Sequence, residues 1–371
     1  MKQLSIMFKP ASSLCNMRCQ YCFYADVSQT REVASYGRMR TEDAEAVLEN
    51  IFAGLDPGDR VTLGFQGGEP TLAGLDFFRA FTDRAEKLAA KGVETAYAIQ
   101  TNGLLVDEAW CAFFKEHNYL VGLSLDGPAA YHDANRLDER RKGTFRRVME
   151  TKGLLDRHGV EYNVLTTLTN ALARHPQQLW SFVEEQDIRF LQLIPCLGPL
   201  DGGKNPYALT PERYVFFYET LFRLWLQSFR RGAYRSVKLF DDLVNLLAFG
   251  QCNACGLLGR CQTQLVVEAD GGVYPCDFYV LDGWKTGDLR RDSLQTVWDR
   301  GQSGGFLTRP TDTPAFCQDC PYRPICGGGC PRMRREVFGG GPGAKLCGHR
   351  KFLDGAIAPL QQVAGEIRRR G

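Results

Sequence analysis

The chain has 371 residues and a formal net charge of +2, with 44% hydrophobic and 24% charged residues. This length allows two domains on the usual scale of about 100 to 200 residues each, and the interspersed acids and bases argue against nucleic acid as the main partner. The N-terminal apolar run is too short for a signal peptide, and no stretch approaches the roughly 18 apolar residues of a membrane span. We therefore expect a cytoplasmic protein that binds neither nucleic acid nor membrane.

The first 200 residues or so alternate short β-rich runs with longer amphipathic stretches. The expected strands are Leu4–Phe8, Val61–Phe65, Ala96–Ile99, Leu120–Leu125, Tyr162–Thr167 and Phe190–Ile194. The expected helices are 41–54 with Thr41 as N-cap, Leu75–Ala90, Asp107–His117, Gly143–His158, Pro176–Gln186 and a long one from Thr210 to Arg231. Six strand-helix units predict a parallel sheet with right-handed crossovers, either an open doubly wound sheet or a partial barrel. Around Arg235 the alternation of strands and helices ends.

Polar residues follow most of these strands, at the edge where parallel α/β proteins bind their ligands. They are the cysteine loop after the first strand, then 66–70, 100–103, 124–127 and 195–198. The second of these segments reads Gln-Gly-Gly-Glu-Pro. Its two glycines let the backbone approach a ligand closely, and Glu69 could receive a cationic amine. A plain strand-to-helix turn is the structural alternative.

The loop after the first strand holds Cys15, Cys19 and Cys22 in a C-x3-C-x2-C spacing. Three thiolates can hold a metal centre while leaving one coordination site open for chemistry. A zinc knuckle without its fourth ligand is the alternative, but no histidine lies nearby in the sequence. In a cytoplasmic chain, clustered cysteines indicate metal binding in preference to disulfides.

This loop, with Tyr21 before its last cysteine, resembles the cluster loop of the radical S-adenosylmethionine (SAM) enzymes. In that family three cysteines bind a [4Fe-4S] cluster whose fourth iron takes SAM, and residues 67–70 resemble its GGEP motif, which receives the amino group of SAM. The resemblance implies a partial (β/α)6 TIM-like barrel. It also implies SAM contacts at Tyr21, Gly68, Ser124, Arg136 and Leu197.

Nine of the 14 cysteines follow residue 250. Their recurring C-x2-C spacing is compatible with zinc ribbons, but the full pattern resembles the SPASM extension of radical SAM enzymes that modify peptides. The resemblance implies a radical SAM domain over 1–235 and a SPASM domain over 236–371 with two auxiliary [4Fe-4S] clusters, three clusters in all. The first auxiliary cluster would be held by Cys255, Cys261, Cys276 and Cys330, and the second by Cys317, Cys320, Cys326 and Cys347. Cys252 could replace Cys255.

Among SPASM enzymes the chain is similar to the anaerobic sulfatase-maturating enzymes, through residues 22–26, 66–75, 100–103 and 274–282. Their activity implies oxidation of a cysteine or serine in a C/S-x-P-x-R context of an unfolded or nascent sulfatase to Cα-formylglycine. A SAM-derived 5′-deoxyadenosyl radical would start the reaction, and a donor such as flavodoxin or ferredoxin would supply electrons. The resemblance assigns the role of catalytic base to Asp277, since a carboxylate can accept a proton from a thiol or a hydroxyl.

Two other functions remain open at this point. A SPASM maturase of ribosomal peptides would form thioether or carbon-carbon crosslinks, although a first strand near residue 4 leaves no room for the usual leader-binding domain. A zinc-ribbon interaction module would bind nucleic acid or protein without catalysis, although the near-neutral charge weighs against it. Whether the target is cysteine, serine or both is also open.

Overall fold

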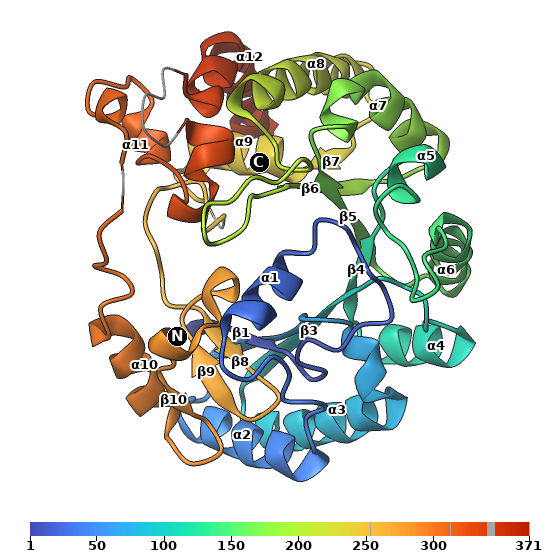
Figure 1. Ribbon diagram of the computed structural model, residues 1–371, viewed down its shortest axis with the longest axis vertical. Coiled ribbons are helices and arrows are strands. Elements are labelled where there is room, and N and C mark those ends of the chain that lie inside the picture. Colours follow the sequence, from blue (N-terminus) through green and yellow to red (C-terminus); the bar gives the residue numbers. More distant parts are fainter. Residues whose placement is uncertain (253, 312, 340–345, 371) are drawn as a thin grey trace. The chain divides into compact units, whose positions relative to one another are not determined.

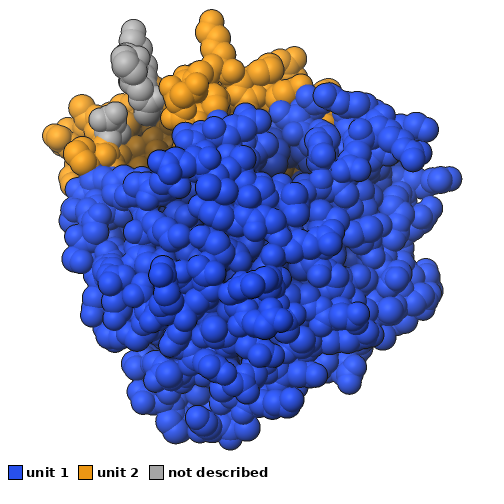
Figure 2. Space-filling view, turned by 60° about the horizontal axis from the view of Figure 1, so that its bottom comes forward, with its two compact units in different colours: residues 1–124, 136–162, 262–309 blue, residues 125–135, 163–261, 310–371 orange. Residues whose placement is uncertain are grey.

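The computed structural model describes residues 1–252, 254–311, 313–339 and 346–370 (Figure 1). These residues form two compact units, which are coloured separately in Figure 2. Unit 1 comprises 1–124, 136–162 and 262–309, and unit 2 comprises 125–135, 163–261 and 310–371. Each unit therefore combines segments from distant parts of the sequence. No helix among the described residues is both long and apolar enough to cross a membrane.

The sheet of unit 1 contains both N-terminal and C-terminal strands. Its strands, in spatial order, are β10 (Gly287–Asp288), β9 (Gly272–Tyr274), β8 (Leu265–Val267), β1 (Gln3–Phe8), β2 (Arg60–Phe65), β3 (Glu94–Thr101) and β4 (Leu120–Ser124). The pairs β1–β2, β2–β3 and β3–β4 are parallel, as predicted. The β8–β9 hairpin was not predicted, because three-residue strands carry too little periodicity to be recognised. β8 pairs in parallel with β1, so a segment far along the chain ends beside the cysteine loop.

The helices of unit 1 each bury apolar side chains. They are α1 (Phe23–Thr30), α2 (Thr41–Ala53), α3 (Leu75–Ala89), α4 (Glu108–Glu116), α6 (Phe145–His158) and α10 (Leu294–Ser303), with short turns at Pro70–Ala73, Asp277–Tyr279 and Asp282–Trp284. Phe65 of β2 lies against Phe78 and Phe81 of α3, with ring centroids 4.8 and 4.9 Å apart. Burying a side chain of this size contributes about 1.5–3 kcal/mol. These contacts fix the strand ends that carry the site.

One predicted helix cap is wrong by one residue. Thr41 is the first residue of α2, and Arg40 occupies the N-cap position without a side-chain cap. The Arg40 guanidinium instead binds the Asp43 carboxylate in the first turn, at 2.7 and 3.0 Å. Thr210, where the long helix was expected to begin, caps the helix Pro211–Arg230 by accepting a hydrogen bond from the Arg213 amide. Asp107, the first residue of another expected helix, accepts one from the Trp110 amide.

Unit 2 contains the last strands of the predicted series and most of the C-terminal cysteines. Its strands are β5 (Tyr162–Leu168, of which Tyr162 belongs to unit 1), β6 (Phe190–Pro195) and β7 (Ser236–Val237). Its helices are α5 (Ala129–His132), α7 (Pro176–Glu185), α8 (Pro211–Arg230), α9 (Lys238–Phe249), α11 (Arg323–Cys326), a π-helix at Arg334–Phe338 and α12 (Gly348–Arg370). Short turns lie at Leu172–Arg174, Ala315–Cys317 and Pro331–Met333. β5, β6 and β7 are parallel neighbours. Phe352 of α12 packs among the aromatic rings of α8 and α9.

Candidate functional site

The cysteine loop after β1 is held in place by backbone hydrogen bonds from the segment after β2. The amide of Gly68 donates to the carbonyl of Ser12 at 2.8 Å, and the amide of Glu69 donates to the carbonyl of Leu14 at 2.8 Å. Within the loop, the Leu14 amide donates to the Ala11 carbonyl at 2.9 Å. The GGEP segment therefore shapes the backbone directly before Cys15.

Both glycines of this segment are needed for that close approach. Gly67 has φ = 135°, a conformation that residues with a β-carbon rarely adopt, and the stem of Lys9 packs against it. A β-carbon on Gly68 would overlap the carbonyl oxygen of Leu14. From the sequence we expect these glycines to let the backbone approach a ligand; in the structure they let it approach the cysteine loop.

Replacing Gly68 with alanine will displace the cysteine loop, because the backbone of Leu14 cannot move aside as a flexible side chain could. We expect a destabilisation of about 1–3 kcal/mol, the usual cost of overpacking, together with a lower iron content after reconstitution. Denaturant unfolding and iron analysis check both effects. Gly74→Ala is the matched control: its φ is 90° but no atom lies near its β-carbon position, so it will lose stability without losing iron. Equal iron loss in both variants would contradict this role of Gly68.

The Glu69 carboxylate is hydrogen-bonded to other groups of the protein. Its side chain is buried, Oε1 accepts hydrogen bonds from Thr71 and Thr101, and Oε2 accepts one from the Asn102 amide at 2.7 Å. Burial raises the pKa of this carboxyl, and the hydrogen bonds from Asn102 and Thr71 oppose the rise. Through these hydrogen bonds the carboxylate links the segment after β2 to the end of β3. The backbone of the GGEP segment is therefore a better candidate than this carboxylate for contacting a ligand amine.

The predicted cluster cysteines of the loop lie close together. Burial raises the pKa of the Cys15 thiol to about 12, and the charges of Glu69, Cys19 and Cys22 add to the rise. The Cys15 sulfur also accepts a hydrogen bond from the Met17 amide at 3.4 Å. Mutually repelling thiolates need a cation or cluster to balance them, so this group fits the predicted iron-sulfur site.

Four of the five predicted SAM contacts lie in unit 1. Tyr21 faces Arg136, with the guanidinium carbon 5.6 Å from the ring centroid, and Arg136 is nearly buried. Ser124 is the last residue of β4, and Gly68 touches the cysteine loop as described. Leu197 follows β6 in unit 2, where its carbonyl accepts a hydrogen bond from Asn205 at 3.1 Å. Their contact with SAM stays a prediction.

Asp277 lies among residues that follow the ends of β1 and β2. The Lys9 ammonium pairs with Oδ1 at 2.5 Å, and Nε2 of Gln66 donates to Oδ2 at 3.2 Å. The Lys9 side chain is fully buried, whereas that of Asp277 is 13% exposed. The β8–β9 hairpin carries Cys276 and Asp277 to this place. One unit thus holds the predicted base, the cysteine loop and the GGEP segment.

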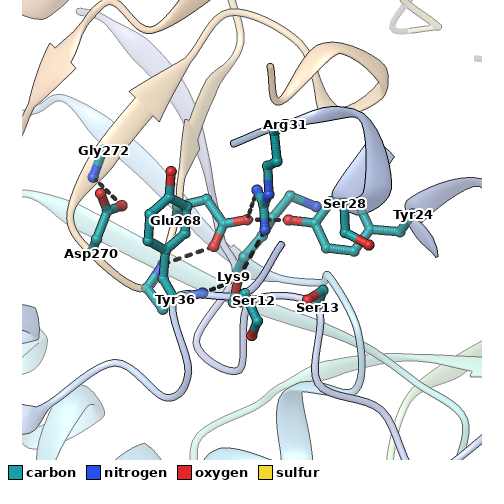
Figure 3. A network of polar contacts seen from close by, with 12 residues as sticks. Lys9, Ser12, Ser13, Tyr24, Ser28, Arg31, Tyr36, Glu268, Asp270 and Gly272 are labelled. Atoms are coloured by element: carbon teal, nitrogen blue, oxygen red, sulfur yellow. Dashed lines mark hydrogen bonds and ion pairs between the residues drawn. The ribbon is translucent and has the colours of Figure 1, made fainter. Parts of the chain in front are cut away.

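A buried polar network ties the same hairpin to the cysteine loop (Figure 3). Glu268, the residue after β8, pairs with Arg31 at 2.7 Å and accepts a hydrogen bond from the hydroxyl of Tyr24, and both ionic side chains are fully buried. The second terminal nitrogen of Arg31 donates to Ser12 Oγ at 3.1 Å. Glu268 raises the pKa of Arg31 against the opposing effect of burial. This network links the loop, α1 and the segment leading to Asp277.

Replacing Glu268 with glutamine will leave the Arg31 guanidinium buried without a counter-charge. Breaking a buried ion pair in this way costs about 3–5 kcal/mol, and chemical denaturation will measure it. The exposed pair between Arg60 and Glu94 is the matched control, because Glu94→Gln removes a surface ion pair worth about 0–1 kcal/mol. A Glu268→Gln protein as stable as the Glu94→Gln protein would contradict this reading of the network.

The C-terminal cysteines fall into two groups. One pocket of unit 2 is lined by Cys317, Cys320, Cys326 and Cys347, the four predicted for the second auxiliary cluster. Burial raises the pKa of the Cys326 thiol to about 12, and its three partners add to the rise. No three metal-binding side chains among the described residues could share one metal ion, but in a [4Fe-4S] cluster each thiolate binds a different iron. The four-cysteine pocket therefore fits a cluster.

The set predicted for the first auxiliary cluster is divided between the units. Cys255, Cys261 and Cys330 belong to unit 2, where the Cys330 amide donates to the Gly256 carbonyl at 2.9 Å, and Cys276 belongs to unit 1. Their shared cluster stays a prediction, as does the alternative ligand Cys252. Cys111 of α4 is fully buried, as expected of a small apolar residue.

Sequence reasoning missed Lys9, Arg31 and Glu268. Lys9 could have been found, because it directly follows the first strand and the rule for strand ends applies to it as it does to Gln66. Glu268 follows a strand too short to recognise, and Arg31 lies in a stretch without helical or strand periodicity. Nothing in their local sequence indicates that they meet.

Sequence models of two families match the chain: the Radical SAM superfamily over residues 10–176 and an iron-sulfur cluster-binding domain called SPASM over residues 246–321. The second match favours iron-sulfur clusters over the zinc-ribbon alternative. Both matches support the predicted fold class.

Curated relatives match almost the whole chain. A cysteine-type anaerobic sulfatase-maturating enzyme of Clostridium novyi is 39% identical over 98% of each chain, and one of Clostridium perfringens is 40% identical over 90% of each. A serine-type enzyme of Klebsiella aerogenes is 28% identical and covers 98% of this chain and 87% of its own.

Solved structures agree with these relatives. The anSMEcpe structure with bound AdoMet and the Cp18Cys peptide has a TM-score of 0.89 and 36% identity, covering 98% of this chain and 99% of its own. Streptococcus suis SuiB with bound S-adenosylmethionine, at 18% identity and a TM-score of 0.61, covers 89% of this chain and 73% of its own and shares the fold. The predicted fold class, a partial radical SAM barrel with a SPASM domain, is confirmed.

Proposed function

Because this chain belongs to the anaerobic sulfatase-maturating enzymes of the radical SAM superfamily, we propose that it oxidises a cysteine in a C-x-P-x-R segment of a sulfatase to Cα-formylglycine. The observation that carries this proposal is the Asp277 carboxylate, which follows Cys276 and is held by Lys9 and Gln66. A cysteine target is favoured over serine because the cysteine-type relatives are 39–40% identical and the serine-type relatives 27–28%.

The residues that would hold the cofactors are those derived above. Cys15, Cys19 and Cys22 would hold the SAM-binding cluster, and the two C-terminal sets would hold the auxiliary clusters, with SAM itself reached by Tyr21, Gly68, Ser124, Arg136 and Leu197. When bound, these groups supply hydrogen-atom abstraction at the substrate Cβ and take up one further electron.

The chain's own task is to remove the remaining proton. Loss of one hydrogen atom from Cβ, one electron and the thiol proton converts the cysteine side chain into a thioaldehyde, which water hydrolyses to the aldehyde with release of hydrogen sulfide. Asp277 is the acceptor of that proton, since its carboxylate is partly accessible. Lys9 and Gln66 hold one carboxylate oxygen each, which orients the base before substrate binds.

The test is an anaerobic incubation of the reconstituted enzyme with SAM, a reductant and a peptide containing C-x-P-x-R. We expect an aldehyde, detected by mass spectrometry after capture with a hydrazine reagent, and less aldehyde from a serine twin of the peptide. An alanine twin controls for SAM cleavage without substrate oxidation. A crosslinked peptide without aldehyde would instead indicate a maturase of ribosomal peptides, and SAM cleavage without any peptide product would contradict both functions.

Other features of the proposal come from the sequence alone. These are the domain division at residue 235, the flavodoxin or ferredoxin donor and the cytoplasmic location. The partner we propose is an unfolded or nascent sulfatase segment, because the target thiol must come within reach of the Asp277 carboxylate, whose side chain is only 13% exposed.

A further inference from the structure

Two polar side chains lie near the four-cysteine pocket of unit 2. Each has one buried nitrogen for which the described residues offer no hydrogen-bond partner. They are Arg334, the first residue of the π-helix Arg334–Phe338, and His349, the second residue of α12. Arg334 is 5% exposed and His349 is 1% exposed. Buried polar groups are normally satisfied, so both indicate a partner that the polypeptide does not supply.

Arg334 brings a buried positive charge to the pocket. Its Nε donates to the Gly328 carbonyl at 3.1 Å, and its Nη1 is buried without a hydrogen-bond partner among the described residues. The position that a β-carbon of Gly328 would occupy lies 3.6 Å from Arg334 Nη2 and 4.0 Å from the Cys317 sulfur. An uncompensated buried cation is costly, and a cluster bound by four thiolates is the negative group that balances it.

His349 can offer an N–H donor, its Nε2, at the same pocket. Its Nδ1 lies 3.0 Å from the hydroxyl of Tyr214, and its Nε2 is buried without a partner in the described part of the chain. When Tyr214 donates to Nδ1, the neutral ring carries its proton on Nε2. His349 lines the four-cysteine pocket with Phe338, whose ring packs against it at 5.4 Å.

We propose that Arg334 and His349 raise the reduction potential of the [4Fe-4S] cluster held by Cys317, Cys320, Cys326 and Cys347. Reduction adds one negative charge to the cluster, and a buried cation and an N–H donor to its sulfur atoms stabilise that charge. The proposal rests on the proposed ligand set. It gives this cluster the property that an electron acceptor needs in the proposed reaction.

The test is a redox titration, followed by electron paramagnetic resonance, of the full-length reconstituted protein. Alanine at Cys15, Cys19 and Cys22 removes the signal of the SAM-binding cluster and leaves two midpoint potentials. In this background, Arg334→Gln will shift one midpoint to more negative potential and leave the other unchanged. His349→Phe will shift the same midpoint in the same direction by less, because it removes a donor and no charge.

Matched variants separate these effects from general damage to the pocket. Arg323 also lines it but is exposed, so Arg323→Gln removes the same charge from a site that water screens and will shift the midpoint much less. Arg334→Lys keeps the charge, and His349→Gln keeps an N–H near the position of Nε2. Both will stay closer to the parent than Arg334→Gln and His349→Phe.

Each outcome decides the proposal. Unchanged midpoints in Arg334→Gln and His349→Phe at full iron content overturn it, as do equal shifts in Arg334→Gln and Arg323→Gln. If Arg334→Gln loses iron, the midpoints of Arg334→Lys and of the two His349 variants are compared with the parent instead. Iron loss in all of these variants would show a structural role and overturn the proposal. Unchanged iron in Cys320→Ala refutes the ligand set and the proposal with it. Formylglycine yield is measured separately, because its failure bears on the proposed function alone.

Discussion

Replacing Asp277 with asparagine will leave SAM cleavage intact and abolish formylglycine formation. The amide cannot accept the thiol proton, while the cysteine loop, the GGEP segment and Tyr21 are untouched. Production of 5′-deoxyadenosine and of peptide aldehyde, measured in the same anaerobic reaction, checks the two halves of this expectation. Aldehyde at the yield of the parent enzyme would refute the assignment of Asp277 as the base.

The same substitution has a structural cost that must be separated from the chemical one. It leaves the fully buried Lys9 ammonium without its ion pair, and breaking a buried ion pair in this way costs about 3–5 kcal/mol. The double variant Lys9→Met/Asp277→Asn removes both charges and will recover part of that stability. We expect it to remain without product, whereas recovered product would mean that Asp277 acts through stability.

Removing a cysteine of the opening loop will stop the reaction at its first step. Cys15→Ala will lose about a third of the iron bound by a protein with three [4Fe-4S] clusters, and it will form neither 5′-deoxyadenosine nor aldehyde. Cys320→Ala will lose a similar share of iron but will keep SAM cleavage, because the four-cysteine pocket and the loop are separate ligand sets. Iron analysis and chromatography of the nucleoside distinguish the two variants.

Cys111→Ala is the control for both cysteine variants. Cys111 is fully buried in α4 and belongs to no predicted cluster, so its replacement will cost some packing but no iron. SAM cleavage by Cys15→Ala at the parent rate, or an unchanged iron content in it, would contradict the ligand assignment.

Most of the parallel sheet was predictable from sequence because its strands are apolar runs bounded by polar turns. Val61–Phe65 was predicted and Arg60–Phe65 is observed, and Phe190–Ile194 is observed as Phe190–Pro195. The grouping of the loop cysteines was predictable from their C-x3-C-x2-C spacing, whereas the four cysteines that line the pocket of unit 2 were indicated by the resemblance to the SPASM extension. Three-residue strands such as β8 and β9 carry no such pattern.

The candidate site was predicted less completely than the sheet, because its polar groups meet only after distant segments fold together. The family resemblance indicated Asp277, but its partners Lys9 and Gln66 are more than 200 positions away in the sequence. Glu69 shows the converse. Its motif indicates a ligand contact, but its carboxylate oxygens already accept hydrogen bonds from the hydroxyls of Thr71 and Thr101 and from the Asn102 amide.

The opening loop owes its shape to polypeptide contacts: the hydrogen bonds from Gly68 and Glu69 and the anchor from Arg31 to Ser12. The groups that make these contacts lie outside the loop, after β2 and directly after α1. Substitutions at residues that would never touch iron can therefore change how Cys15, Cys19 and Cys22 are placed.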